Sequence, residues 1–417
     1  MKKIIRHLSL VLAFMVQQIS MAQSEGLTSS PYSLYGLGTI NQTSIGRSNG
    51  IGYTGIGIRS EDGINNLNPS HLALIPQNSF YYDIGIVGEF NSYSNAGYEE
   101  SKNTLNFSNL AFSFRLAERL GLGVSLIPYS DVGYTLLGLV SNIEGSSETF
   151  ESNVSGLGGL NDLSLNMGYG LTDSFRIGLR GTILFGSIEE SEGFDISNSY
   201  FQLDEKTNYS GIRIGSGFQF DFSENLTLGS TVQWPTSLSG HLTRTVYKTL
   251  DGVEIRVEED ENDTVSDFKL PLELGIGIGA RLWGSLMLSA DYKHNFWDAT
   301  EQSESTGTFV DQDIYALGLE YVKNPRGFRY RERIQFRAGV NYDNGYLALN
   351  ENKVDGYTVT AGLGLPMGSG NRSSMLNISY AYGSKGQIQN ILVRENYHTL
   401  TVNFSLEDLW FRDRKID

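Results

Sequence analysis

The sequence predicts an all-β fold, a transmembrane, antiparallel, up-and-down β-barrel of about 14 strands with an N-terminal plug. Three observations predict it: a hydrophobic period of two from residue 79 onward, charge confined to one of the two faces, and connections that alternate in length. A chain of 417 residues can form one large barrel or two or three ordinary domains. Its 48 glycines, 23 tyrosines and 21 phenylalanines suit strands with small residues on one face and aromatic residues on the other.

The composition excludes several classes of function. The chain has no cysteine, which excludes a disulfide scaffold, a Cys-ligated zinc or iron–sulfur centre and a thiol nucleophile. The formal net charge of −16 argues against a nucleic-acid partner, because contacts with phosphate need a basic face.

The N-terminal segment 1–22 has the pattern of a signal peptide. Lys2, Lys3 and Arg6 precede a short apolar run, which a small-x-small pattern follows, so we expect this segment to be removed on export. An amphipathic or buried first helix is the alternative. No other segment approaches about 18 uninterrupted apolar residues, which argues against a helical membrane protein. Export then leaves a soluble periplasmic or secreted protein, or an outer-membrane barrel of a Gram-negative cell.

The predicted strands follow from residue 79 to residue 411. In one of the clearest strands, every second residue is apolar: Leu120, Leu122, Val124 and Leu126. About fourteen such segments of about 9–13 residues occur, each long enough to cross a bilayer at a tilt. We therefore expect the barrel to occupy residues 79–411 and a periplasmic tail to occupy residues 412–417.

Charged side chains fall on the polar parity of these segments. A charge at the lipid midplane costs roughly 2–4 kcal/mol, so a bilayer requires one face free of charge. The polar residues expected to line the lumen are Arg176, Arg180, Arg213, Glu273, Asp291, Lys293, Glu320 and Arg337. They could guide a polar or carboxylate ligand or hydrogen-bond to the plug, and we favour the plug.

Connections and tryptophans indicate the orientation. Short turns alternate with generally longer polar loops, three of which span 131–159, 188–207 and 236–268. Bacterial barrels have short periplasmic turns and long outer loops, so a periplasmic N-terminus places these loops outside. We expect four tryptophans to act as interface anchors, two at the outer strand ends and two at the periplasmic ends: Trp234, Trp297, Trp283 and Trp410.

The segment 23–78 lacks sustained alternation. Its Asn68-Pro69 pair starts a turn, and residues 70–75 could form one helical turn with Asn68 near its cap. A 14-stranded lumen is wider than its wall side chains can fill. We therefore expect this segment to fold as a plug, or hatch, inside the barrel; the alternative is a periplasmic tail.

At this point the sequence resembles a known family, the FadL long-chain fatty acid transporters of the outer membrane. That family has a 14-stranded barrel plugged by an N-terminal hatch with an Asn-Pro-Ala motif, which corresponds here to Asn68, Pro69 and Ser70. Ser70 departs from the motif. The resemblance implies that these three residues gate the hatch. The start Ser30-Pro31-Tyr32 and the end Leu409-Trp410-Phe411 also resemble exported barrels of Bacteroidota, some of which are partners in secretion or assembly machines.

The sequence predicts no catalytic, cofactor or metal site, and hence no enzyme. No spacing points to a Ser-His-acid triad or a histidine metal site among the few histidines. The acidic run 258–263 offers oxygen ligands for Ca²⁺ but lacks the spaced loop of an EF-hand, so a solvated outer loop is the simpler interpretation. Gly275-x-Gly277-x-Gly279 has no βαβ context for a nucleotide, and these glycines are expected to leave room for the plug.

Two functions remain open from the sequence. The first is a porin-like, FadL-type channel for passive uptake of small hydrophobic molecules, such as long-chain fatty acids, gated by the hatch. The second is a non-transporting structural barrel, a subunit of an outer-membrane secretion or assembly complex. The expected partners are outer-membrane lipid, a hydrophobic ligand and other outer-membrane proteins, without nucleic acid.

Overall fold

A computed structural model describes residues 28, 30–42, 44–60, 62–95, 98–142, 149–196, 199–250, 253–303, 307–367, 374–388 and 392–409. The expected signal peptide, Trp410 and the expected tail 412–417 lie outside these residues. Among the described residues, no helix has both the length and the hydrophobicity that a bilayer crossing needs.

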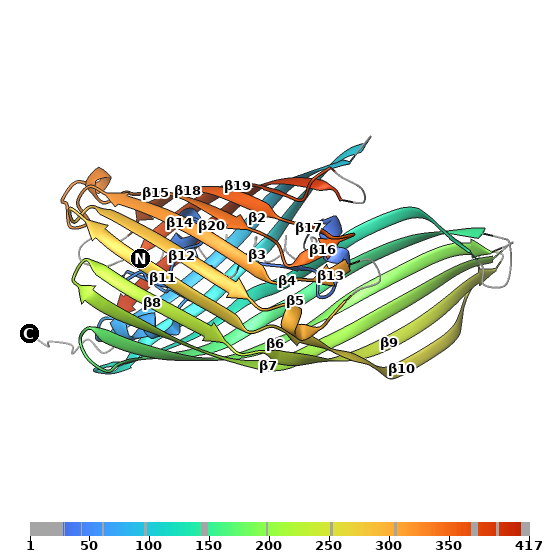
Figure 1. Cartoon of the computed structure of the whole chain (residues 1–417), viewed down its shortest axis with the longest axis horizontal. Coiled ribbons are helices and arrows are strands. Elements are labelled where there is room, and N and C mark those ends of the chain that lie inside the picture. Colours follow the sequence, from blue (N-terminus) through green and yellow to red (C-terminus); the bar gives the residue numbers. More distant parts are fainter. Residues whose placement is uncertain are drawn as a thin grey trace, which may run out of the picture.

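The wall is a closed barrel of 14 antiparallel strands, which confirms the predicted fold class (Figure 1). Twelve of the 14 strands are continuous, and the other two are each broken into a pair of segments, β8 with β9 and β10 with β11. The wall segments are β2 (Ser79–Asn95), β3 (Tyr98–Ala117), β4 (Leu120–Asn142), β5 (Thr149–Gly170), β6 (Phe175–Ile196), β7 (Ser199–Ser223), β8 (Leu226–Gln233), β9 (Thr236–Leu250), β10 (Val253–Leu270), β11 (Glu273–Leu282), β12 (Leu286–Asn295), β14 (Gln312–Val322), β15 (Gln335–Asp343), β18 (Gly356–Pro366), β19 (Met375–Lys385) and β20 (Arg394–Leu409). The last strand, β20, pairs with β2 and closes the ring.

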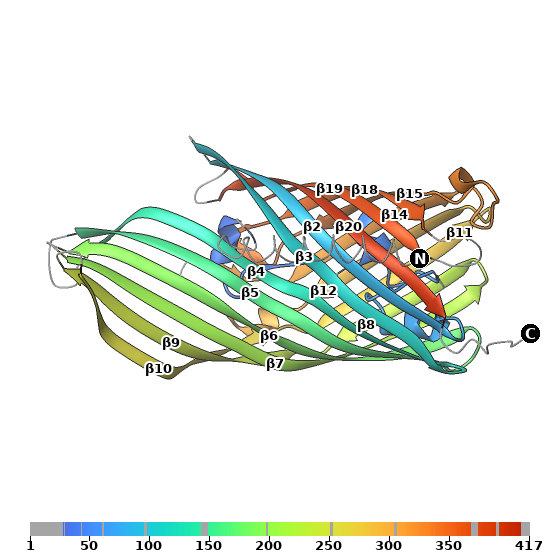
Figure 2. The ribbon, with the colours of Figure 1, turned by 180° about the vertical axis from the view of Figure 1, so that it is seen from behind.

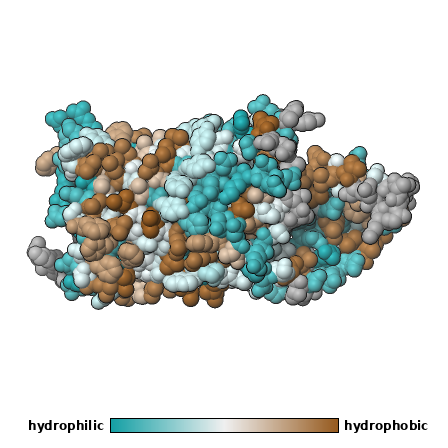
Figure 3. Space-filling view, in the orientation of Figure 1, coloured by the Kyte–Doolittle hydropathy of each residue, from teal (hydrophilic) through white to brown (hydrophobic). Residues whose placement is uncertain are grey.

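The two faces of the wall differ as the alternation predicts. On β6, Ile177, Leu179 and Ile183 are exposed on the outside, whereas Arg176 and Arg180 are buried inside. Hydrophobic residues accordingly gather on the outer surface of the barrel, over the left half of Figure 3. An apolar outside and a polar lumen are what a strand wall facing lipid requires.

Several strands continue far past the rim of the barrel. β4, β5, β6 and β7 have 22 to 25 residues, whereas β12 has only 10 (Figure 1). The expectation of long polar loops at 131–159, 188–207 and 236–268 was therefore wrong, because most of these residues are strands. The period of two continues through them, but polar side chains mask it.

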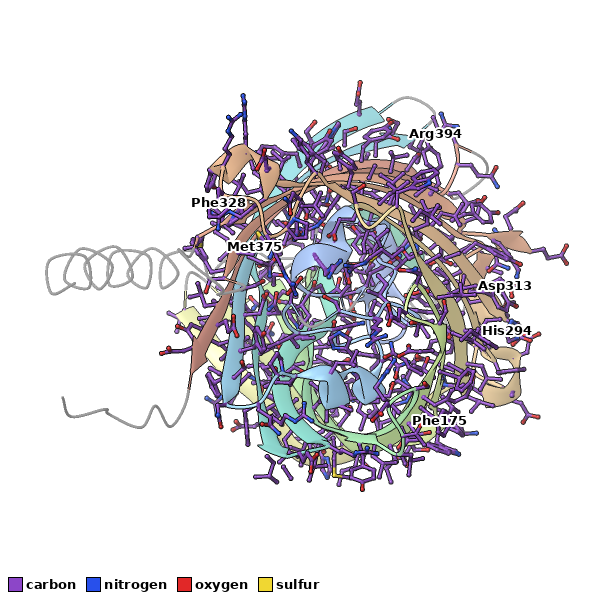
Figure 4. All side chains as sticks on the ribbon, turned by 90° about the vertical axis from the view of Figure 1, so that its left-hand side faces the viewer. Phe175, His294, Asp313, Phe328, Met375 and Arg394 are labelled. Atoms are coloured by element: carbon purple, nitrogen blue, oxygen red, sulfur yellow. The ribbon has the colours of Figure 1, made fainter. Side chains whose placement is uncertain are left out.

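The N-terminal segment lies inside the barrel. It contains the 3₁₀ turns η1 (Pro31–Leu34), η2 (Gly46–Gly50) and η3 (Pro69–Leu74) and the short strand β1 (Thr39–Ile40). Figure 2 shows these turns behind the wall, and Figure 4 shows them surrounded by it. The first wall strand, β2, begins directly after this segment, which we call the hatch.

Smaller elements cover the outer side of the hatch. They are η4 (Asp298–Thr300), β13 (Gly307–Phe309), β16 (Leu347–Leu349) and β17 (Asn352–Lys353), of which the three strands form a separate sheet. The remaining turn, η5 (Tyr330–Glu332), lies in the β14–β15 connection.

Trp297 is buried in an apolar cluster and does not anchor an interface. It is only 2% exposed and stacks on Phe309 and Tyr346, with ring centroids 5.4 and 5.3 Å away. The expectation for Trp297 was therefore wrong, because a position at a strand end does not say whether the side chain turns toward lipid or back over the lumen. Trp234 and Trp283 are exposed, and their anchoring role stays a prediction.

Candidate functional site

The Asn68-Pro69-Ser70 motif begins η3 and fastens it to the wall. Asn68 is the N-cap of this turn, and its side-chain oxygen accepts hydrogen bonds from the Ser70 backbone nitrogen (3.1 Å) and hydroxyl (2.7 Å). Pro69 occupies the first turn, where no backbone donor is needed. The Asn68 amide donates to the carbonyl of Phe218 on β7 (3.0 Å). The motif therefore holds the turn in shape and joins it to the barrel.

Glycines on the wall let this turn approach closely. A Cβ at Gly178 on β6 would overlap the backbone nitrogen of Ser70, and one at Gly121 on β4 would overlap the carbonyl oxygen of Leu72. The hatch backbone thus lies directly on strand backbone at these positions. The wall glycines Gly275, Gly277 and Gly279 meet the hatch in the same way, near Ile56 and Gly57, as the sequence predicted.

Asp291 on β12 binds the hatch backbone. One of its carboxylate oxygens accepts hydrogen bonds from the backbone nitrogens of Gly55 (2.7 Å) and Ile56 (3.0 Å). Gln219 on β7 donates from its amide to the carbonyls of Ile56 (3.0 Å) and Ile58 (3.1 Å). The Asp291 carboxylate therefore serves the backbone donors of this buried hatch segment, and the Gln219 amide serves its backbone acceptors.

Glu320 on β14 lies between two arginines. The hatch residue Arg47 reaches one carboxylate oxygen at 2.7 Å, and Arg337 on β15 reaches the other at 2.8 Å. Glu320 and Arg337 are buried, and such an arrangement is stable only while every charge keeps its partner.

The other predicted lumen residues divide into three groups. Arg180 donates to the Asn66 carbonyl of the hatch, and Arg176 forms a two-bond pair with Asp221 (both 2.7 Å). Lys293 lines a cavity described below. Arg213 and Glu273 pair with each other at 2.7 Å and line the same cavity as Lys293.

Arg213 closes a break in the wall. Two wall strands are interrupted side by side, between β8 and β9 at Pro235 and between β10 and β11 at Pro271. Arg213 on β7 donates to the carbonyls of Trp234 (3.0 Å) and Pro271 across this break. Proline cannot complete a strand ladder, so the arginine replaces the missing partners.

The described residues enclose two polar cavities in the lumen, with volumes of about 230 and 130 Å³. The hatch residues Ile40, Asn41 and Gln42 line both and separate them. The larger cavity lies where β3 and β4 diverge, since their pairing ends at Leu110 and Leu126. Its wall includes four carboxylates, from Glu89, Asp131, Asp343 and Glu395.

His71 in η3 is buried. Burial, reinforced by the positive charges of Arg176 and Arg47, lowers the pKa of His71 to about 3 from 6.5. The imidazole is therefore neutral at physiological pH. Among the described residues, no group of three or more His, Asp or Glu side chains converges as a metal site would require.

Sequence reasoning missed the hatch side of these contacts. Arg47 and Arg59 form ion pairs with wall carboxylates, at 2.7 Å from Glu320 and 3.3 Å from Asp221. They are the only basic residues other than histidine between 23 and 78, and this rarity was the available signal.

Comparison with known proteins finds one matching family and many solved structures of similar fold. The family model described as BamG matches residues 4–417. A search of curated proteins finds no match.

Three solved structures resemble the chain over most of its length. The Pseudomonas putida toluene transporter TodX has a TM-score of 0.62 at 14% identity, covering 89% of this chain and 100% of its own. The Ralstonia pickettii toluene transporter TbuX has a TM-score of 0.60 at 16% identity, covering 88% and 99%. A Pseudomonas aeruginosa FadL homologue has a TM-score of 0.60 at 14% identity, with the same coverage. The predicted resemblance to FadL-type outer-membrane barrels is thus confirmed for the fold.

Proposed function

The chain belongs to the BamG family, and from this premise we propose that it is a closed structural barrel that serves as a subunit of an outer-membrane complex. Its outward apolar surface holds it in the lipid, and its lumen is occupied by the hatch rather than kept open for a solute.

The attachment of the hatch to the wall carries this proposal. Asp291, Glu320 and Arg180 on three different strands bind hatch groups, and Asn68 and Gln219 add contacts through β7. Withdrawing the hatch would leave buried charges without partners, and breaking one such buried pair costs about 3–5 kcal/mol. A gate that opens often would not be held by so many of these contacts at once.

The cavities support the same proposal. Pockets for small molecules usually measure about 300–1,000 Å³ and are mainly apolar. The larger cavity here is about 230 Å³ and has acidic, amide and hydroxyl groups in its wall. Such a lining disfavours a long hydrocarbon, which offers no partner for those groups.

Two measurements on the same preparation test the proposal. The barrel is purified from native membranes under mild detergent and its mass determined, and a sample is reconstituted into liposomes for uptake of a labelled long-chain fatty acid. We expect a stoichiometric complex with other membrane proteins and no uptake above empty liposomes. A barrel that purifies alone and carries the fatty acid inward would contradict the proposal.

Passive uptake of small hydrophobic molecules is the second candidate. The specific observation in its favour is the divergence of β3 and β4, which brings the larger cavity to a gap in the wall lined by Phe107 and Ile127. The titles of two similar structures name toluene transporters. In this candidate, Asn68, Pro69 and Ser70 would gate the lumen. Saturable uptake whose rate Gly121→Val changes, by displacing the adjoining hatch turn, would favour it.

A further inference from the structure

Six strand segments form a sheet that stands beyond the rim of the barrel. They are 132–142 of β4, 149–160 of β5, 186–196 of β6, 199–210 of β7, 236–250 of β9 and 253–265 of β10. We call this sheet the outer extension. Figure 1 shows it curving away from the barrel on the right, with a concave face toward the axis of the barrel.

The polarity of the strands reverses in the outer extension. β6 pairs with β5 and β7 without a register shift, so Phe194 lies on the same side as the lumen residues Arg180 and Leu184. On the opposite side of the outer extension, Ser191 bonds to Asp204 (2.6 Å) and Lys206 pairs with Glu189 (2.6 Å). In the barrel wall the outside is apolar, whereas here the outside is polar and therefore faces water.

The concave face carries apolar side chains that one lysine interrupts. Phe194 faces Phe201 on β7, and Lys248 on β9 lies between Phe201 and Ile255 on β10. The Lys248 ammonium lies over the Phe201 ring, 5.4 Å from its centroid. The Phe194 and Phe201 rings stack at 5.7 Å, and Phe150 joins them at 5.2 Å from Phe194. Ile255 is 53% exposed. Figure 3 shows hydrophobic surface at this end of the molecule.

Acidic groups adjoin this apolar row. On the concave face, Glu190 and Glu205 face each other across β6 and β7, and Glu258 and Asp260 follow on β10. Arg244 pairs with Glu205 at 2.6 Å and faces Asp260 on β10. The six segments contain thirteen Asp and Glu residues against four Lys and Arg residues, a formal charge of −9 within the −16 of the whole chain.

The β10 edge of the outer extension is open. Along its whole length β10 pairs with β9 only, within the described part of the chain. At the base of β10 the Gln302 side chain bonds both the nitrogen (2.6 Å) and the carbonyl (2.9 Å) of Lys269, as a neighbouring strand would. Farther out, between 253 and 260, no such substitute is seen among the described residues, and exposed Val253 and Ile255 lie on this edge.

We propose that the concave face of the outer extension docks a basic polypeptide segment with apolar side chains, supplied by a partner protein outside the membrane. The apolar side chains would cover the row of Phe150, Phe194 and Phe201, and lysines or arginines would meet the acidic groups beside it. Aromatic side chains are common anchors of protein interfaces, and opposite charges steer the partner to them. The inference rests on the proposed function and names the surface through which the barrel would bind a partner of the complex.

The charge separates this occupant from two others. An anionic lipid headgroup would be repelled by a surface with a formal charge of −9. A second copy of the chain would bring the same negative charge to the interface. A positively charged partner segment is attracted to this surface and meets neither repulsion.

The test measures binding of one defined probe to the intact barrel in phosphatidylcholine nanodiscs. The probe is a fluorescent 12-residue peptide of alternating lysine and valine, with a glutamate–valine peptide as the charge control. Phe194→Ser combined with Phe201→Ser removes the apolar row. The matched control is Tyr200→Ser combined with Gln202→Ser, which alters the outward face of β7.

We expect the lysine–valine peptide to bind the wild type and the control variant alike, and about tenfold more weakly to the Phe194→Ser, Phe201→Ser variant. The glutamate–valine peptide is expected not to bind. Equal weakening by both variants, or equal binding of both peptides, would overturn the inference.

A second measurement uses the protein in its native membrane. A photocrosslinking amino acid is placed at position 255, on the concave face, or at position 254, which points outward. The inference predicts an adduct to a basic segment of another protein from position 255 only. Adducts to lipid or to a second copy, or equal yields from both positions, would overturn it. If the complex purifies as expected but position 255 gives no protein adduct, the docking surface is wrong while the proposed function stands.

Discussion

Asp291 is an ionisable residue that the fold keeps away from water and uses to bind hatch backbone. The same holds for Glu320, which two arginines enclose. At the scale of residues, the lumen is therefore built for binding its own hatch. The alternation of apolar and polar residues predicted that both residues line the lumen. It could not predict their partners in the hatch, because the alternation shows on which face of the wall a side chain lies and not what it contacts there.

The first prediction concerns Asp291. Asp291→Ala leaves the nitrogens of Gly55 and Ile56 without an acceptor, and each buried unpaired group costs about 1–3 kcal/mol. Hydrogen exchange of the amides at 55–57 should become at least tenfold faster than in the wild type. Asp291→Asn keeps an acceptor oxygen and should retain most of the protection. Unchanged exchange in the alanine variant would show that Asp291 does not hold the hatch.

The second prediction concerns His71 and pH. Its pKa is about 3 in the folded protein, against about 6.5 in an unfolded chain. Between these values the unfolded chain binds a proton that the folded protein does not, so the free energy of unfolding falls as the pH drops from about 6.5 toward 3. His71→Gln lacks this contribution.

Thermal unfolding of the wild type and of His71→Gln between pH 7 and pH 4 checks this. The difference between their unfolding temperatures should shift steadily in favour of the variant as the pH falls. Parallel curves would mean that His71 takes up its proton in the folded state as well.

At the scale of elements, close backbone contact fixes the hatch. The turn η3 lies against glycines of β4, β5 and β6. A side chain at any of these glycines would overlap the backbone of η3. The sequence predicted this turn and its Asn68 cap from a local signal, Asn-Pro followed by a short apolar run. The long strands of the outer extension were not predicted as strands, because their reversed polarity resembles the polar loops of a barrel.

The third prediction uses two glycines on β6. Gly178→Val places a side chain where the Ser70 backbone lies, whereas nothing lies within 4 Å of a Cβ at Gly181. The first variant should displace η3 and expose residues 62–78 to added protease. Gly181→Val should behave as the wild type. Similar resistance of both variants would contradict the contact between η3 and β6.

At the scale of the whole molecule, one set of strands provides two surfaces. In the barrel their apolar face turns outward to lipid, and in the outer extension their apolar face turns inward and awaits a partner. The barrel and its strand number were predictable because lipid imposes a simple rule on every strand. The outer extension obeys a different rule, set by a partner that the sequence does not contain, which is why the sequence alone did not reveal it.

The electrical conductance of the purified barrel in a planar lipid bilayer tests the central claim, that the hatch closes the lumen, most directly. The account predicts no steady current from the wild type and stepwise current from a barrel that lacks residues 28–78, with intermittent current from Gly178→Val. A steady, open pore in the wild type, with a conductance equal to that of the hatch-less barrel, would contradict it.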